Sequence, residues 1–313
     1  MSTRPLSLVP IMTKCDAWLM ATSLREQLWG EMSKHPNGTS TGSESTFPRG
    51  KSLPSQSPLF WVQQKDRYLR QLLIADIEAM TGRRLVVYFA NRFKQESFIN
   101  AGDIPYVAEL LGDLSKAPAD LLLETNGGET DATEAIVSLL QSTVPDLRVI
   151  VTNAAKSNGT VICLAASEII MGPTSELGPI DPSVGGMPAS IAAEPIVAQQ
   201  NYALHRLAAY AIMQTTKLAT SLLKNGMLAG KSDQEVGNVV AALSTKNVFH
   251  SHGSVVDHRE ATALGLAVRY LPEDDELWRR IWLLHCMYAQ DITARNHLKI
   301  FEGRARSTSV AAP

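Results

Sequence analysis

Cysteine is scarce in this 313-residue sequence and occurs in no recognisable pairing pattern. The three cysteines, Cys15, Cys163 and Cys286, lie far apart, and none belongs to a C-x-x-C pair. Their odd number and wide spacing argue against a disulfide framework and against a zinc site built from thiolates. Cys163 lies in the apolar run 161–166, so we expect it to be a buried thiol that contributes packing.

Long apolar runs and an excess of charge of either sign are also missing. No run approaches the roughly 18 residues that cross a bilayer, and the apolar stretch 6–12 is too short for a signal-peptide core. The 29 basic and 31 acidic residues give a net charge of -2, without the basic excess typical of nucleic-acid binding or of binding to anionic membranes. We therefore expect a cytoplasmic protein with no membrane span and no nucleic-acid partner.

The sequence predicts one folded domain flanked by less regular segments. Residues 36–58 are dense in Ser, Thr, Pro and Gly and hold too few large apolar side chains to order themselves. We predict an N-terminal arm and disordered linker over 1–59 and a folded domain over 60–272. A C-terminal helix is predicted within 273–303, with a broad apolar face that could contact another subunit. The small and polar residues 304–313 are predicted to form a disordered tail.

Within the folded domain, short apolar segments alternate with amphipathic ones. Strands are predicted at 85–90, 120–124, 147–152 and 168–171, and helices at 64–80, from 103 onward, at 130–141 and at 158–166. Strands and helices that alternate at such short intervals form a parallel sheet covered by helices. The fold class is therefore α/β.

The loop after the second predicted strand contains a pair of glycines. Gly127 and Gly128 follow Thr125 and Asn126, just before a predicted helix. A Gly pair lets the backbone turn sharply and expose its N–H groups to a negative charge, as an oxyanion hole requires. A purely structural turn is the alternative.

The loop after the third predicted strand contains a serine. Ser157 lies between Lys156 and Asn158, where its oxygen would lie close to the N–H groups of its own loop. A serine that only caps the next helix is the alternative. The two loops are about 30 residues apart and end neighbouring strands, which favours a shared site.

Four segments carry a recognisable pattern: MTGRRLVVYFA at 80–90, LLLETNGGETDATEAI at 121–136, AAKSNGTVICLAASEIIMGPTSELGPIDP at 154–182 and HSHGSVVDHREATALGL at 250–266. In order and spacing they resemble the serine dehydrogenase proteinase family, a branch of the superfamily that contains Clp protease, signal peptide peptidase and crotonase. The resemblance spans roughly 65–272. The third segment is its most specific part. Where the family pattern reads His-Thr-Pro-Gly-Gly, this chain has Glu124, Thr125 and Asn126 before the Gly pair.

The resemblance implies a Clp protease/crotonase-like fold of repeated β-β-α units. It implies a serine peptidase that cleaves a peptide or protein substrate through an acyl-enzyme on Ser157. The oxyanion hole would consist of the N–H of Gly128, or of Gly127, together with the N–H of Asn158. No cofactor and no metal are expected, and a homo-oligomer is expected because relatives of this fold assemble into rings or stacked discs.

The general base is not evident from the sequence. Clp protease has a histidine about 25 residues after the serine, but 177–182 contains none. Signal peptide peptidases use a lysine, which acts as a base only where burial keeps the amine neutral. Lys217, which lies in an apolar helical stretch, is our first candidate, and a solvated helix lysine is the alternative. His252 and Lys156 are reserve candidates, although Lys156 adjoins Ser157 and neighbouring side chains diverge.

Three functions remain open on the sequence alone. Besides the serine peptidase, a crotonase-like acyl-CoA enzyme would use the same backbone oxyanion hole without needing Ser157. A catalytically inactive Clp-like scaffold would bind peptides or partners only. His250 and His252 could ligate a metal, but no third ligand is evident, so a structural role is expected for them. The peptidase is favoured because crotonases need no serine in this loop.

Overall fold

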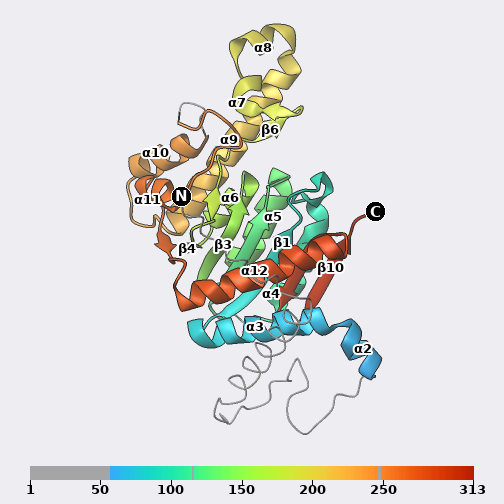
Figure 1. Cartoon of the computed structure of the whole chain (residues 1–313). Helices are drawn as coiled ribbons and strands as arrows, with labels where there is room; N and C mark the ends of the chain where they lie inside the picture. Colours follow the sequence, from blue (N-terminus) through green and yellow to red (C-terminus); the bar gives the residue numbers. More distant parts are fainter. Residues whose placement is uncertain (1–56, 115, 245–247) are drawn as a thin grey trace, which may run out of the picture. The chain divides into compact units, whose positions relative to one another are not determined.

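A mostly parallel sheet forms the centre of the protein in the computed structural model, which describes residues 57–114, 116–244 and 248–313 (Figure 1). The predicted arm and most of the predicted linker, residues 1–56, lie outside the described residues. The main sheet has eight strands, with β9 His297–Gly303 and β10 Ser307–Ala311 at one edge. The order is β10-β9-β1-β2-β3-β4-β8, with β5 paired to the end of β3. The parallel strands are β1 Arg84–Ala90, β2 Ala119–Thr125, β3 Leu147–Ala155, β4 Glu168–Met171, β5 Glu176–Leu177 and β8 Val268–Tyr270.

Helices cover both faces of this sheet. One face packs against α4 Ile104–Gly112, α5 Thr130–Thr143 and α6 Asn158–Cys163, and the other against α3 Lys65–Thr81 and α12 Glu276–Ala294. The β1 side chains show why both faces are apolar, since Val86 and Tyr88 enter the first core and Val87 and Phe89 the second. The predicted α/β fold with a parallel sheet between helices is therefore confirmed.

The remaining elements complete the described chain. They are α2 Pro58–Gln63, η1 Gln95–Ser97, η2 Ala101–Asp103, β6 Ser183–Val184, β7 Met187–Pro188, α7 Ala189–Ala192, α8 Pro195–Gln200, α9 Tyr202–Asn225, α10 Asp233–Ser244 and α11 His258–Ala263. The short helices α7 and α8 and the start of α9 project away from the sheet (Figure 1). Among the helices that the structure describes, none is both long and apolar enough to cross a bilayer.

The C-terminal region differs from its prediction. The helix α12 ends at Ala294, and Asn296, with a φ of 55°, turns the chain back. The strands β9 His297–Gly303 and β10 Ser307–Ala311 follow, both antiparallel to their neighbours. The helix predicted within 273–303 is therefore present as α12 but ends before residue 297, and the prediction of a disordered tail over 304–313 was wrong. The strand β9 depends on pairing with β1, more than 200 residues earlier, which local sequence patterns do not reveal, and β10 pairs with β9.

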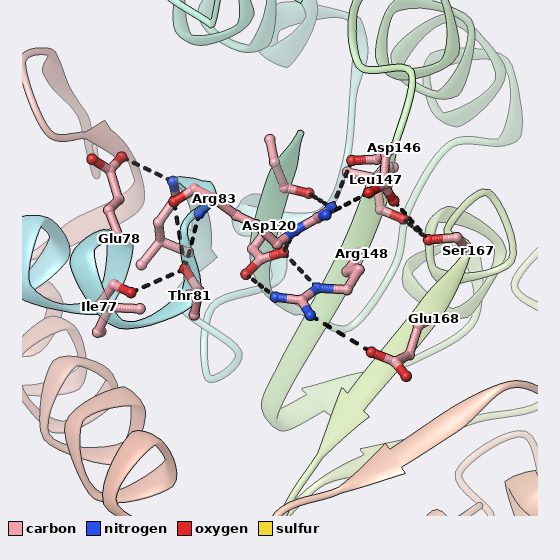
Figure 2. Close-up of polar contacts among 12 residues, drawn as sticks. Ile77, Glu78, Thr81, Arg83, Asp120, Asp146, Leu147, Arg148, Ser167 and Glu168 are labelled. Atoms are coloured by element: carbon pink, nitrogen blue, oxygen red, sulfur yellow. Dashed lines mark hydrogen bonds and ion pairs between the residues drawn. The ribbon is translucent and has the colours of Figure 1, made fainter. Parts of the chain in front are cut away.

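A network of ion pairs lies at the amino-terminal ends of β2 and β3 (Figure 2). The Asp120 side chain is 1% exposed and accepts hydrogen bonds from Arg83, at 2.7 Å, and Arg148, at 2.7 and 2.9 Å. Arg83 also pairs with Asp146, and Arg148 with Glu168. Every charge in this network has a partner, and it lies at the end of the strands opposite the two glycine- and serine-containing loops. We therefore assign it a role in stability.

Candidate active site

The two loops singled out in the sequence meet at the carboxyl ends of β2 and β3. Thr125 is in register with Ala155, and the Lys156 N–H donates to the Thr125 carbonyl at 3.0 Å. The Asn158 side-chain amide donates to the Gly128 carbonyl at 2.5 Å and so ties the loops together. Adjacent parallel strands thus bring together residues about 30 positions apart.

The Gly pair is held in a conformation that only glycine fits. Gly127 has a φ of 95°, and a Cβ on it would lie 2.8 Å from the Ser157 Cβ and 3.0 Å from the Asn158 nitrogen. A Cβ on Gly128 would lie 2.2 Å from the carbonyl oxygen of Ile99. The Ile99 backbone clamps the loop, since its N–H donates to Gly127 and its carbonyl accepts from Glu129.

The N–H groups of the two glycines have different surroundings. The Gly127 N–H donates to the Thr125 hydroxyl at 3.0 Å. The Gly128 N–H donates to no acceptor in the described part of the chain. Of the two donors considered from the sequence, Gly128 is therefore the one whose N–H is available to a ligand.

Ser157 lies in a strained turn between β3 and α6. Its φ of 51° and ψ of -119° are unusual for a residue with a side chain and cost on the order of 1–3 kcal/mol. Its hydroxyl makes no capping hydrogen bond to α6, so a simple helix cap does not explain the residue. Such a strand-to-helix turn holds the nucleophile of several hydrolases.

Asn158 offers a second available N–H next to the serine. Its backbone N–H has no acceptor within 57–114, 116–244 and 248–313, while its side chain is bound to the Gly128 carbonyl and the Thr130 hydroxyl. The loops therefore present one serine side chain and two unpaired N–H groups in one place. This is the donor and nucleophile set that acyl transfer requires.

Lys156 is engaged away from the serine hydroxyl. Its Nζ donates to the carbonyls of Leu177 and Ser254, both at 3.0 Å, and lies 3.2 Å from a carboxylate oxygen of Glu176. Burial lowers the pKa of Lys156, and the Glu176 carboxylate opposes that shift. With three oxygen partners around the amine, Lys156 stabilises the position of the serine loop against β5 and against the segment that contains Ser254.

Lys217 does not lie in the apolar pocket that a lysine base needs. It lies on α9 and is exposed, whereas its neighbour Ala219 is buried. Three residues earlier, the Gln214 side chain donates to Asp131 at 2.7 Å, so this part of α9 lies beside the start of α5. Lys217 is thus at an exposed position on a helix near the Gly-pair loop.

His252 lies in a segment that packs beside the serine loop. The carbonyl of Ser254 accepts from Lys156, and Val256 forms an isolated bridge with Leu177. His252 is half-buried, and its Nδ1 is buried without a hydrogen-bond partner among the residues with described positions. A ring nitrogen in that state is available for proton transfer or for a ligand.

The other polar residues of this segment have structural contacts. Asp257 accepts from the N–H groups of Arg259 and Glu260 and so caps α11. His258 stacks on Tyr270 with ring centroids 4.0 Å apart. Within the described ranges, no group of three or more His, Cys, Asp or Glu could hold a metal ion.

Three further residues lie next to the two loops: Glu124, His285 and Arg92. The sequence analysis gave them no role. Glu124, at the end of β2, is 2% exposed and accepts from the Ala154 N–H and from Arg92. His285 of α12 lies 2.8 Å from the Thr152 hydroxyl and 3.9 Å from Glu124. A carboxylate within an apolar strand, and an arginine two residues after another strand, were the signals that could have revealed Glu124 and Arg92.

Burial shifts the pKa values of Glu124 and His285 in opposite directions. Burial raises the pKa of Glu124 to about 7, although Arg92 and the hydrogen bonds from Ala154 and Asn153 oppose the shift. Burial, and to a smaller extent Arg92, lowers the pKa of His285 to about 4. His285 is therefore neutral near pH 7, where Glu124 is close to half-protonated.

We expect the two residues to give opposite pH dependences of stability. Protonated Glu124 contributes stability that is present below pH 4.5 and is lost as the pH rises through 7. Neutral His285 contributes stability that is present above pH 6.5 and is lost as the pH falls through 4. Each contribution is about 3 kcal/mol, and the two change with pH in opposite directions, so the stability of wild type should change little between pH 4.5 and 6.5.

Urea unfolding of Glu124→Gln and His285→Gln at pH 4.5, 6 and 7.5 tests this. Relative to wild type, Glu124→Gln should gain stability as the pH rises, and His285→Gln should gain stability as the pH falls. Differences from wild type that do not change with pH would show that neither residue titrates as its burial demands.

This chain is similar to a protein family, to two relatives and to a solved structure. Residues 110–307, more than half of the chain, match the family of ClpP-like SDH-type serine proteinases. Two relatives from Methanocaldococcus jannaschii, the uncharacterized proteins MJ0137 and MJ1495, are 30% and 28% identical over 185 and 184 residues. The matches cover 57% of this chain in both cases, and 61% and 59% of the relatives, so the chain spans about three fifths of their length.

Among solved structures, a point mutant of ClpP1 from Listeria monocytogenes is similar, with 19% identity and a TM-score of 0.41 over 67% of this chain and 99% of that one. The family match contains both loops of the candidate site and most of the sheet. The chain therefore belongs to the ClpP-like SDH-type serine proteinase family.

Proposed function

We propose that the protein is a serine peptidase that cleaves peptide bonds through an acyl-enzyme on Ser157. The observation that carries this proposal is the strained turn that presents Ser157 beside two N–H groups with no acceptor in the described chain. A serine that only capped α6 would bond to the helix and would not need a left-handed backbone.

The proposed reaction has two steps. The Ser157 oxygen attacks the peptide carbonyl carbon while its proton passes to a general base, and the N–H groups of Gly128 and Asn158 stabilise the oxyanion. The C–N bond then breaks, and the base returns the proton to the leaving amine. Water, deprotonated by the same base, then attacks the acyl carbon, the C–O bond to Ser157 breaks, and the base returns the proton to the Ser157 oxygen as the acid product leaves.

For the base we propose His252, with Lys217 as the alternative. His252 is favoured by its half-buried ring, by the unpartnered Nδ1 and by its place in the segment bound to the serine loop. Lys217 would need a bound substrate or a second copy of the chain to remove its amine from water. Lys156 is the least suited, because its amine is already shared among three oxygens.

A pH profile of kcat/KM separates the two candidates, measured on the fluorogenic peptide that wild type cleaves fastest. We expect His252→Ala to lower kcat/KM by about 10²- to 10⁴-fold and to abolish the rise of activity with pH. Lys217→Ala should keep both the rate and the profile. The reverse result would identify Lys217 as the base and refute the assignment to His252.

The two alternative functions make different predictions. A crotonase-like enzyme would turn over acyl-CoA thioesters even as Ser157→Ala, because its oxyanion hole is made of backbone. An inactive scaffold would bind peptides without cleaving them. The left-handed backbone of Ser157 favours the peptidase over both, since neither alternative needs strain at a serine.

We also propose that the protein forms a homo-oligomer. The exposed apolar side chains of α9 support this, because Leu207, Tyr210 and Met213 are between 54% and 65% exposed and recur at helical spacing. The apolar residues of α12, by contrast, mostly face the core next to α3. The projecting helices are therefore better suited than α12 to contact another copy.

A further inference from the structure

Arg92 contacts the residues that precede the two functional loops. It binds Asn126, which precedes the Gly pair, directly, and it reaches Lys156, which precedes Ser157, through one neighbour. Arg92 follows β1, and its Nε donates to the Asn126 side-chain oxygen at 2.8 Å. The Asn126 amide donates back to the Arg92 carbonyl at 2.7 Å. Asn126 directly precedes Gly127, so Arg92 fixes the start of the Gly-pair turn from both its side chain and its backbone.

The same guanidinium reaches the serine loop through Glu176. Arg92 lies 3.4 Å from Glu176, whose other carboxylate oxygen lies 3.2 Å from the Nζ of Lys156. Lys156 directly precedes Ser157. A continuous series of polar contacts, Asn126–Arg92–Glu176–Lys156, therefore joins the residue before the Gly pair to the residue before the serine.

Arg92 is itself held by a second carboxylate. It lies 3.4 Å from Glu124, which also accepts from the Ala154 N–H and the Asn153 side chain at the end of β3. The Arg92 side chain is 23% exposed, so most of it is shielded from water. Its planar guanidinium presents its N–H donors in a rigid fork toward three separate acceptors, a geometry that a lysine ammonium does not reproduce.

We propose that Arg92 is a positioning residue that fixes the Gly128 N–H relative to the Ser157 oxygen. This inference rests on the proposed function. Oxyanion stabilisation requires donors about 2.7–3.1 Å from the developing charge, and a misplacement of about 1 Å can cost 10²-fold in rate. Arg92 needs no contact with the substrate to have this effect.

The test measures how fast a fluorophosphonate probe labels the full-length protein at several probe concentrations. These rates give kinact, the rate constant of the covalent step, and KI, the probe concentration at half of the maximal rate. Arg92→Met removes the donors and keeps an unbranched side chain that reaches about as far as the arginine Nε, and it should lower kinact by about 10²-fold with little change in KI. The control is Arg148→Gln, which breaks a partly buried ion pair at the other end of the sheet and should leave kinact unchanged.

A rescue variant separates positioning from a general effect of charge. The Asn126 N–H has no acceptor within the described ranges, its φ is not positive, and Thr125 before it is in a strand, so a proline fits at 126. Asn126→Pro added to Arg92→Met should stiffen the turn again and recover at least about tenfold in kinact.

Each outcome bears on the proposal. Wild-type kinact in Arg92→Met, an equal loss in Arg148→Gln, or no recovery with the added proline would overturn it. If Arg92→Met does not fold, Asn126→Ala replaces it with the same expected loss of kinact. If wild type itself is not labelled, the proposed function fails first, so the two failures are distinguishable.

Discussion

Ser157→Ala should lower kcat/KM for peptide cleavage by about 10⁴-fold or more, because it removes the atom that forms the acyl-enzyme. The hydroxyl makes no capping hydrogen bond, so its removal should change the free energy of unfolding by less than about 0.5 kcal/mol. Peptide hydrolysis and urea unfolding of the same preparations measure both quantities. A variant that keeps activity would remove Ser157 from the mechanism.

Ser157→Gly provides a matched control at the same position. Glycine adopts a positive φ without strain, so this variant should be as inactive as Ser157→Ala but more stable than wild type by about 1 kcal/mol. A gain in stability on losing a functional side chain is expected where strain serves the reaction. A loss of stability in Ser157→Gly would show instead that the serine is retained for structure.

Gly128→Ala should lower kcat by about 10²- to 10³-fold, the usual effect of losing one oxyanion donor. A Cβ at this position would lie 2.2 Å from the Ile99 carbonyl oxygen and 2.4 Å from its nitrogen, both of which are backbone atoms. The Gly-pair turn must therefore move away from Ile99, and the Gly128 N–H moves with it. Steady-state kinetics should show the loss mainly in kcat.

The control for this variant is Gly237→Ala in α10. A Cβ there meets no atom within 4 Å, and alanine favours a helix by roughly 0.5–1 kcal/mol over glycine. Gly237→Ala should therefore keep full activity and gain a little stability. Wild-type kcat in Gly128→Ala would show that its N–H is not a donor to the oxyanion.

The central strands and their helices could be predicted from the sequence because their patterns are local. The apolar run LVVYFA and the Gly82 after the preceding helix set the bounds of β1 and α3 within a residue or two. The strand β9 could not be predicted in the same way. It contains Lys299, which is 2% exposed because Asp103 and the Phe98 carbonyl, about 200 residues away, accept its hydrogen bonds.

The candidate site was predictable to the extent that it consists of loop residues next to strand ends. Gly127, Gly128, Ser157 and Asn158 could be proposed because parallel strands bring their loops together at one edge of the sheet. The base could not be predicted, because burial decides whether a lysine or histidine is suitable, and burial depends on the whole fold. The role of Arg92 could not be predicted for the same reason, since its three acceptors lie on different elements.

The most direct test of the account is covalent labelling of the purified protein with a fluorophosphonate probe, followed by mass spectrometry to locate the modified residue. We expect a single adduct on Ser157, no adduct in Ser157→Ala, and slower labelling in Gly128→Ala. A folded protein that the probe does not label, or labels on another serine, would contradict the claim that Ser157 is an activated nucleophile.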